Sequence, residues 1–429
     1  MLFKNLTTLD NNSTVEQKIQ WLKTNQHYCA KPFHTLQLSV NEMDQYRASP
    51  CCNYTGEIGL LPPDDQFLQL KTDIINGVKN KGCALCWQSE ETNDSSERIR
   101  DMLYWQPQEI NNFINTGVIK EFNLGTMFSN VCNLACRSCR SSASSTYSLI
   151  TEQPVSKSLS IDIRENVDKW EALLTYTREL VEKYELVRIG LIGGETMLQR
   201  GATEYINFLA SLKNVNNIVL ALTSNFTSLN QVVFDHLDKF RRLDLTASVD
   251  SCGENYHYVR WPAQFSKIQN NIDEYLRIRK ESKALTTFGI ASVFGLNNIF
   301  YIKEYLDFLY NSFRKRSDIT IHVLLLTQPN VISIENLPIR YRPMLSEYIR
   351  QAIAHPVLRN PNALPMKIFL EGVETFLKSD RVVYSRFTDF LKFTANFDRR
   401  TDCYFDHFNK RLYDILTIED KTLYQGFLK

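Results

Sequence analysis

Short segments typical of strands recur through the middle of the chain, and segments with helical spacing separate them. The strand segments either alternate apolar and polar residues or are apolar throughout, while the intervening segments repeat apolar residues every three or four positions. Strands that alternate with helices predict a parallel sheet and therefore an α/β fold. The expected strands cover residues 120–128, 186–192, 218–225, 243–250, 286–295 and 319–326, and the clearest helical patterns cover residues 205–212, 268–278 and 301–309.

The segments on either side of this region follow other patterns. Residues 33–40 and 46–52 predict a hairpin around a turn at residues 41–44, and a helix is expected from residue 61 to residue 77. The end of the chain is mostly helical in pattern and rich in Phe, Tyr, Asp and Arg. We therefore expect an N-terminal segment (1–24), a small cysteine-rich domain (25–100), a strand–helix domain (115–330) and a helical C-terminal region (331–429).

Composition and charge exclude several classes of protein. The 429 residues are 43% hydrophobic and 23% charged, as in an ordinary soluble chain of two or three domains. A net charge of +1 gives no basis for attraction to nucleic acid or to a membrane surface. The first residues lack the apolar core of a secretory signal, and no segment reaches the roughly 20 apolar residues of a membrane span. We expect a cytoplasmic protein whose clustered thiols stay reduced and bind metal.

Three cysteines occupy one short loop directly after the strand at residues 120–128. Cys132, Cys136 and Cys139 form the pattern C-x3-C-x2-C. Three thiolates at this spacing can hold three irons of a 4Fe–4S cluster and leave the fourth iron open to a ligand. A zinc site is the alternative, although zinc prefers cysteine pairs that complete a tetrahedron with further ligands. The loop lies at the mouth of a strand–helix unit, where α/β folds usually place their chemistry.

The strand and loop together resemble the radical S-adenosylmethionine (SAM) superfamily, whose signature is C-x3-C-x2-C after the first strand of a partial (β/α)6 barrel. The resemblance implies that the open iron chelates SAM and that an electron from the cluster cleaves SAM to a 5′-deoxyadenosyl radical. It also implies an electron donor such as flavodoxin or ferredoxin. Ser138 stands before the third cysteine, where the family often has an aromatic residue near the adenine.

Later segments match the SAM-binding motifs of the family in the expected order. Gly193-Gly194-Glu195 resembles the GGE motif that binds the SAM amino group, with threonine in place of the usual proline after it, and a plain glycine turn is the alternative. Ser248 and Asp250 share one face of a strand and could bind ribose hydroxyls, although strand ends and helix caps use the same residue types. Asn225 is a further candidate at a strand end. Arg260 resembles the family's arginine that faces the SAM carboxylate, and an exposed surface arginine is the alternative. The resemblance also implies that Ala291 and Val293 pack on adenine.

A second group of cysteines precedes the expected barrel. Cys83 and Cys86 form a C-x2-C pair, Cys29 lies just before the expected hairpin, and Cys51 and Cys52 end it. These segments resemble the small twitch domain, here in an N-terminal arrangement, which implies an auxiliary 4Fe–4S cluster; a structural zinc or disulfides are the alternatives. Neighbours on a strand face opposite sides, so we expect only one of Cys51 and Cys52 to be a ligand, with Cys51 favoured because it follows a proline.

The resemblance implies an oxidoreductase that uses SAM to abstract hydrogen from a substrate, with a peptide or protein side chain as the favoured substrate class. A radical SAM dehydrogenase of a small molecule is one alternative, and a non-catalytic iron–sulfur scaffold or sensor is an alternative from a different class. Residues 331–429 either help shape the substrate site or serve only as a packing element.

Overall fold

The computed structural model describes residue 3 and residues 6–40, 46–51, 53–56, 65–92, 96–152, 164, 166–313, 316, 318–326, 329–379 and 386–429. Its strands are β1 (Thr35–Val40), β2 (Tyr46–Ser49), β3 (Glu121–Met127), β4 (Ala135–Cys136), β5 (Leu186–Ile192), β6 (Ile218–Ser224), β7 (Arg242–Ser248), β8 (Arg260–Trp261), β9 (Thr286–Phe294) and β10 (Ile319–Leu325).

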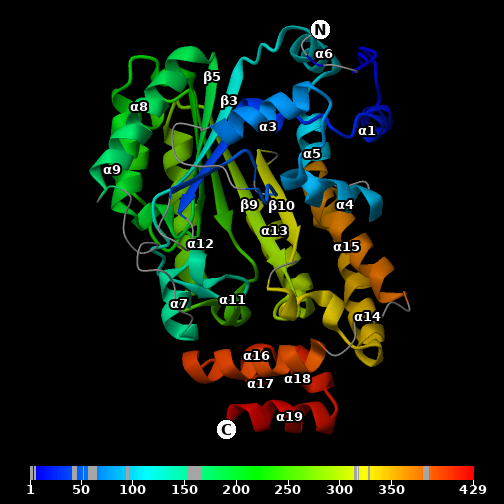
Figure 1. Ribbon diagram of the computed structural model, residues 1–429. Helices are drawn as coiled ribbons and strands as arrows, with labels where there is room; N and C mark the ends of the chain where they lie inside the picture. The colour runs from blue at the N-terminus through cyan, green and yellow to red at the C-terminus, as the bar shows by residue number, and fades with distance from the viewer. Residues whose placement is uncertain are drawn as a thin grey trace.

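One large sheet organises the described chain (Figure 1). Its strand order is β10-β9-β7-β6-β5-β3-β1-β2, and all neighbours except β1 and β2 run parallel. The strands from β3 to β10 in this sheet correspond to the expected ones and stand side by side in chain order, so the predicted parallel α/β arrangement is confirmed. Because the carboxyl ends of parallel strands share one edge, the loops that follow them gather at one end of the molecule.

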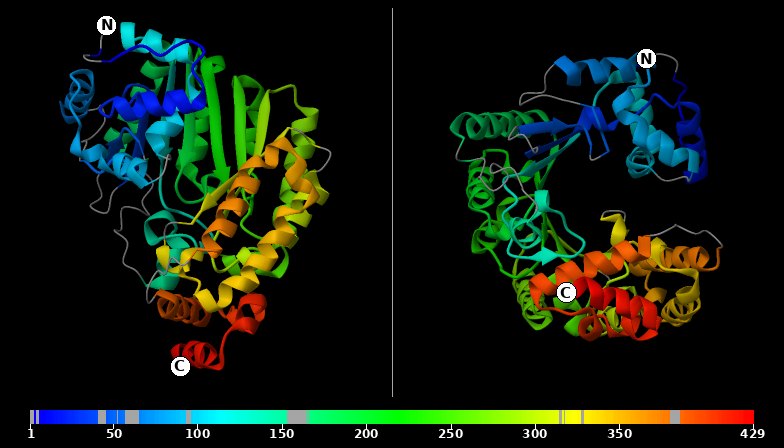
Figure 2. Two further views of the ribbon diagram at one scale, coloured as in Figure 1. Left: turned by 90° about the vertical axis from the view of Figure 1, so that its right-hand side faces the viewer. Right: turned by 60° about the horizontal axis from the view of Figure 1, so that its bottom comes forward.

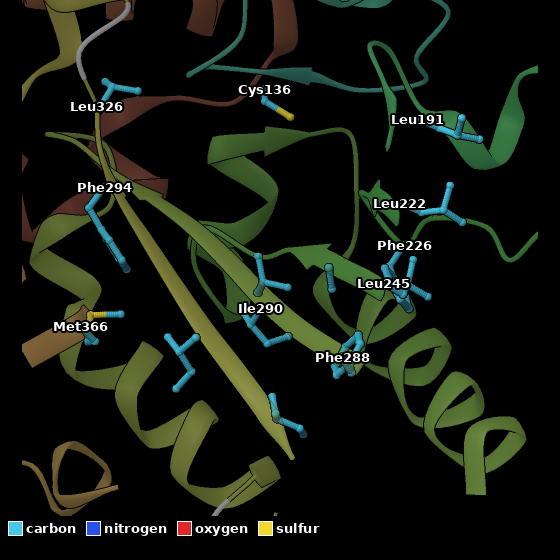
Figure 3. Close-up of a cluster of buried hydrophobic side chains, with 14 of the residues drawn as sticks. Cys136, Leu191, Leu222, Phe226, Leu245, Phe288, Ile290, Phe294, Leu326 and Met366 are labelled. Carbon is cyan, nitrogen blue, oxygen red and sulfur yellow. The ribbon is translucent and has the colours of Figure 1, made fainter. Parts of the chain in front are cut away.

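The two faces of the sheet differ because side chains alternate along each strand. In β7, Leu243 and Leu245 are buried, whereas Arg242 and Asp244 are half-buried on the opposite face. Figure 3 shows part of the apolar face, where aromatic and aliphatic side chains of neighbouring strands gather against helices. The apolar face therefore forms the core, and the polar face is left for a cavity.

Helices between the strands cover the apolar face, as the sequence predicts for the patterns at residues 205–212, 268–278 and 301–309. For example, α8 packs on β5, and α15 of the C-terminal region packs on β10. The helices of this region are α7 (Ser145–Thr151), α8 (Val167–Lys183), α9 (Arg200–Ser211), α10 (Gln231–Asp235), α11 (Gly253–Val259), α12 (Phe265–Glu281) and α13 (Ile302–Phe313), and α15 spans Leu364–Leu377.

The N-terminal hairpin is part of the large sheet, because β1 pairs in parallel with β3 and β2 continues the edge. The second strand ends at Ser49, so the expectation that it reaches Cys51 is wrong: Cys51 lies in a bend after the strand. Cys52, the expected turn at 41–44 and the start of the expected helix at 61–64 lie outside the described residues. The helices here are α1 (Val15–Thr24), α2 (Lys31–His34), α3 (Asp65–Ile75), α4 (Ala84–Thr92), α5 (Glu97–Tyr104) and α6 (Pro107–Thr116).

The C-terminal region is helical, as predicted, and its last helices lie at the opposite end of the molecule from the N-terminal elements (Figures 1 and 2). α16 packs on both α19 and α7, the helix that follows the cysteine loop. In the part of the chain that the structure describes, no helix has the length and apolar character needed to cross a membrane. The remaining helices are α14 (Arg342–Ile353), α16 (Arg386–Thr401), α17 (Phe405–Phe408), α18 (Lys410–Ile415) and α19 (Ile418–Leu428).

Candidate active site

The loop between β3 and α7 carries Cys132, Cys136 and Cys139, and backbone contacts fix it at both ends. Near the β3 end of the loop, the hydroxyl of Thr146 in α7 donates to the Cys132 carbonyl oxygen at 2.6 Å. Farther along, Cys136 belongs to β4, which pairs with β8 so that Cys136 stands opposite Arg260. The Cys139 amide then donates to the Cys136 carbonyl oxygen at 2.9 Å, which closes a tight turn. The loop thus brings the three expected ligands together on an ordered frame.

The three thiols are close enough to influence each other's ionisation. Burial raises the pKa values of all three thiols, that of Cys139 to about 11; neighbouring thiols add to the increase at Cys136 and Cys139, and Glu195 adds to it at Cys132. Arg260 acts in the opposite direction on all three. Thiols with such pKa values are protonated near neutral pH, so metal binding must displace protons, and a nearby guanidinium favours the thiolate form.

The Gly193-Gly194-Glu195 turn packs directly on the cysteine loop. Gly193 and Gly194 have φ angles of +83° and +55°, and a Cβ on Gly194 would collide with the carbonyl oxygen of Val131. The Glu195 amide donates to that same oxygen at 2.8 Å. The glycines therefore let two backbone segments meet, so a purely local turn does not account for them. They place the Glu195 side chain beside the loop.

Glu195 is buried, with 1% of its surface exposed, and three donors surround its carboxylate. Oε1 accepts from the Ser224 hydroxyl at 2.8 Å and from the Met197 amide at 3.0 Å, and Oε2 accepts from the Asn225 amide at 2.6 Å. Burial raises the pKa of Glu195, while these hydrogen bonds and the Arg260 charge oppose the increase. The carboxylate is thus fixed in position by the end of β6 and by the segments that follow β5 and β6; Oε1 already accepts two bonds, and Oε2 can accept one more.

Asp250 and Arg260 form a buried ion pair next to the cysteines. Arg260 Nη1 lies 2.7 Å from Asp250 Oδ2, and Asp250 Oδ1 accepts from the Val293 amide at 2.9 Å. The interpretation of Arg260 as a surface residue is therefore wrong, because the chain folds it against β4. Its Nε is buried and has no hydrogen-bond partner among the described residues. This orphaned donor beside three thiols is suited to an anionic group.

The other expected SAM-binding residues lie around the same strand ends. The Asn225 side chain donates to the Asn133 Oδ1 atom at 3.0 Å and lies 3.9 Å from Cys132 Sγ. Ser248 is half-buried at the end of β7 and pairs with Ala291 of β9. A small pocket is lined by Ser138, Asp250 and Val293, among others.

One residue of that small pocket carried no signal in the sequence. Asn297 lines it, is 3% exposed, and has no hydrogen-bond partner for either side-chain atom among the described residues. Buried amides are normally paired. The Asn297 side chain is therefore a candidate for binding a polar ligand edge, which its place in an ordinary loop does not reveal.

The N-terminal cysteines also come together. Cys29, Cys51, Cys83 and Cys86 all line one pocket of about 520 Å³, counting the space open to solvent. Burial, with smaller contributions from the thiols of Cys51 and Cys86, raises the pKa of Cys83 to about 12. The segments that carry these cysteines are far apart in sequence, so the fold assembles the group. No disulfide joins the described cysteines.

Arg98 holds two of these segments in place, a role that the sequence did not reveal. It is 4% exposed, and its Nη1 donates to the carbonyl oxygens of Asn25, Gln26 and Tyr28 at 3.0–3.2 Å. Its Nε donates to Glu90, one helical turn after Cys86, at 3.1 Å. Arg98 thus ties the segment leading to Cys29 to the helix that carries Cys86.

Within the described ranges, no three His, Cys, Asp or Glu side chains are grouped as a single metal ion requires. A mononuclear zinc draws its ligands to about 2.0–2.3 Å, whereas a cubane cluster holds each thiolate on a different iron and therefore keeps the sulfurs farther apart.

No protein-family model and no curated protein matches the chain. Among solved structures, anSMEcpe with bound AdoMet is 16% identical with a TM-score of 0.39, and the match covers 55% of this chain and 57% of that chain. Streptococcus suis SuiB bound to S-adenosylmethionine is 13% identical with a TM-score of 0.35, covering 63% and 56% of the two chains. SuiB bound to its precursor peptide SuiA is 12% identical with a TM-score of 0.36, covering 73% and 69%.

Proposed function

We propose that the chain is a radical SAM enzyme, whose open sheet serves as the partial (β/α)6 barrel. The observation that carries the proposal is the meeting of the cysteine loop, the Gly193-Gly194-Glu195 turn and the Asp250–Arg260 pair at the carboxyl ends of the parallel strands. Three motifs from separate strands converge there, each with the residue type that SAM binding needs. A scaffold protein would not require a buried carboxylate and a buried guanidinium beside the thiols.

The residues present fit both a 4Fe–4S cluster and SAM. Cys132, Cys136 and Cys139 would hold three irons of the cluster and leave the fourth iron open to SAM. The bound cluster would supply the electron that cleaves SAM to methionine and a 5′-deoxyadenosyl radical. Glu195 would accept hydrogen bonds from the SAM ammonium, and the orphaned Nε of Arg260 would donate to its carboxylate.

The same pocket walls suit the nucleoside part of SAM. Asp250 would accept from the ribose hydroxyls alongside Ser248, since each of its oxygens has one protein donor and can take a second. Val293 and Ser138 line the small pocket next to it, where the adenine would lie. With the smaller serine in place of an aromatic ring, we expect Val293 and Asn297 to contribute more of the adenine contact.

The N-terminal group is proposed to bind a second 4Fe–4S cluster. Cys29, Cys51, Cys83 and Cys86 supply four thiols around one pocket, and Cys51 is the favoured ligand from the hairpin segment. Four thiolates, each on a different iron, would satisfy such a cluster, and a structural zinc is the alternative. This site would accept or relay an electron during turnover, with flavodoxin or ferredoxin as the external donor.

The substrate is proposed to be a peptide or protein side chain. A cavity of about 1270 Å³, counting the space open to solvent, lies between the polar face of the sheet and the N-terminal elements. Charged and hydrogen-bonding groups line it, including Lys31, Asp101 and Arg242, and it reaches Ile192 just before the Gly193-Gly194-Glu195 turn. Side chains of both charges and hydrogen-bonding groups along this wall could bind the amides and charged side chains of a polypeptide segment.

Anaerobic reconstitution followed by addition of dithionite and SAM tests the proposed function. We expect 5′-deoxyadenosine from the wild-type chain and none from the variant with Cys132, Cys136 and Cys139 all replaced by Ala, which should also lose about half of the bound iron. Cys252→Ala, outside both cysteine groups, is the matched control and should retain both properties. If the triple variant still makes 5′-deoxyadenosine, or the wild type makes none, the assignment is wrong.

A further inference from the structure

Arg137 lies inside the cysteine loop, between Cys136 and Ser138, yet it is one of the most deeply buried large side chains, with 1% exposed. Its guanidinium carbon is 3.6 Å from the ring centroid of Tyr258 and 4.5 Å from that of Phe397. Tyr258 belongs to α11, and Phe397 belongs to α16 of the C-terminal region. The side chain therefore joins the cysteine loop to two other parts of the fold.

The hydrogen bonds of Arg137 follow the same pattern. Nε donates to the Tyr258 carbonyl oxygen at 2.8 Å, and Nη2 donates to Asp398 Oδ1 at 2.5 Å and to the Cys403 carbonyl oxygen at 3.3 Å. Its backbone amide donates to the Val259 carbonyl oxygen at 2.9 Å. A guanidinium can serve several acceptors in fixed directions, so this one residue fixes both the position and the orientation of the loop at Cys136.

Asp398 is fully buried and joins the last helices to this contact. Its Oδ2 accepts from the Phe405 amide at 2.8 Å and from the Tyr424 hydroxyl at 2.7 Å. The carboxylate thus connects α16, the start of α17 and α19 to the cysteine loop. Burying an ion pair is costly unless further hydrogen bonds accompany it; here Asp398 and the Nε and Nη2 atoms of Arg137 have such bonds, whereas Arg137 Nη1 has no hydrogen-bond partner among the described residues.

Cys132 is held differently. Ser145 and Thr146 at the start of α7 hydrogen-bond its backbone. The direct supports of the loop therefore differ, α7 for Cys132 and the Arg137–Asp398 pair for Cys136 and Cys139, and α7 itself also packs on α16.

We propose that the C-terminal region positions the cysteine loop, and that Arg137 and Asp398 are the positioning residues that set the placement of Cys136 and Cys139. The positioning is a property of the metal-free chain. Only its consequence for cluster and SAM binding rests on the proposed function. The structure thereby favours a role for residues 386–429 beyond packing.

Hydrogen exchange of the metal-free chain tests the positioning directly. In Asp398→Asn, we expect the amides of residues 133–141 to exchange at least about tenfold faster than in the wild type, because their local opening becomes easier, while residues 27–34 are unchanged. Arg137→Lys keeps the buried charge but loses the planar fork, and it tests the same expectation if Asp398→Asn does not fold. Arg411→Lys is the control, since Arg411 links α18 to Glu304 and Phe300 of the sheet domain and not to the loop.

The double variant Arg137→Met/Asp398→Leu separates positioning from stability. Apolar replacement of a buried ion pair is often neutral for stability, so a wild-type melting temperature with fast exchange at residues 133–141 would support positioning. After reconstitution, the same variants should lose the change that SAM causes in the electron paramagnetic resonance spectrum of the reduced cluster. Wild-type exchange in the loop of these variants would overturn the proposal. Failure of the wild type to bind iron would instead overturn the proposed function and leave the exchange result standing.

Discussion

Glu195→Gln is the sharpest test of the SAM pocket, because the structure shows what the substitution removes. An amide keeps one oxygen for the Ser224 hydroxyl and the Met197 amide, but its nitrogen then faces the Asn225 amide. A buried donor left without an acceptor costs about 1–3 kcal/mol of folding free energy. The lost charged hydrogen bond to the SAM ammonium is worth about 1.5–3 kcal/mol, which corresponds to about 10- to 140-fold weaker SAM binding.

Two measurements, one on the reconstituted protein and one on the metal-free chain, separate these effects. Calorimetric titration of SAM gives the affinity, and urea unfolding of the metal-free chain gives the folding free energy. Glu185→Gln is the matched control, because Glu185 lies just before β5, the strand that precedes Glu195, and makes an exposed ion pair with Lys120. Neither the SAM affinity nor the folding free energy should change much in this control. Wild-type affinity in Glu195→Gln, together with reduced stability, would refute the reasoning and leave Glu195 as a structural residue of the turn.

The pH dependence of the same variant has a defined sign. Burial raises the pKa of Glu195 in the folded chain above the unfolded value of about 4.3. Protonation removes the negative partner of the ammonium, so the affinity difference between wild type and Glu195→Gln should shrink as the pH falls through the folded pKa. Wild-type stability should also decrease as the pH rises from about 4.3 to the folded pKa, because the folded state holds the proton more tightly; the variant lacks this contribution.

Further predictions concern other parts of the molecule. Cys51→Ala should lower the bound iron from about eight to about four per chain, while Cys52→Ala should leave it unchanged; iron analysis decides between them. Arg98→Gln leaves Glu90 buried without its partner and should lower the free energy of unfolding by about 3–5 kcal/mol. The variant should also lose the iron of the N-terminal site but keep SAM cleavage, and Arg100→Gln at an exposed ion pair is the control. Partial burial raises the pKa of Asp244, but hydrogen bonds from Arg242, Arg188 and Thr287 outweigh it and hold the pKa at about 2. Above about pH 4, Asp244→Asn should therefore be less stable than the wild type. Urea unfolding should show that this difference in the free energy of unfolding decreases as the pH falls toward 2.

The sequence predicted the strands of the central sheet because one face is buried, which imposes a period of two on segments such as β7. It could not predict that β1 pairs in parallel with β3, since a period-two pattern does not identify the neighbour. The cysteine motif and the Gly-Gly-Glu turn were visible because their signals are local. Arg137 and Asp398 were not, because they are 261 positions apart and each is an ordinary charged residue until the chain is folded.

Both cysteine groups depend on a buried arginine that is not itself a ligand, and this follows from the kind of backbone that carries the thiols. Cysteine loops have little regular secondary structure, so their carbonyl oxygens need donors from elsewhere. Arg137 and Arg98 each supply several such donors and one carboxylate contact. Gathering thiolates also concentrates negative charge, which Arg98 offsets at Cys29 and Cys83 and Arg260 offsets at the loop. The two requirements of the proposed cluster sites, an ordered loop and compensating charge, are thus both supplied by arginine side chains that are not themselves ligands.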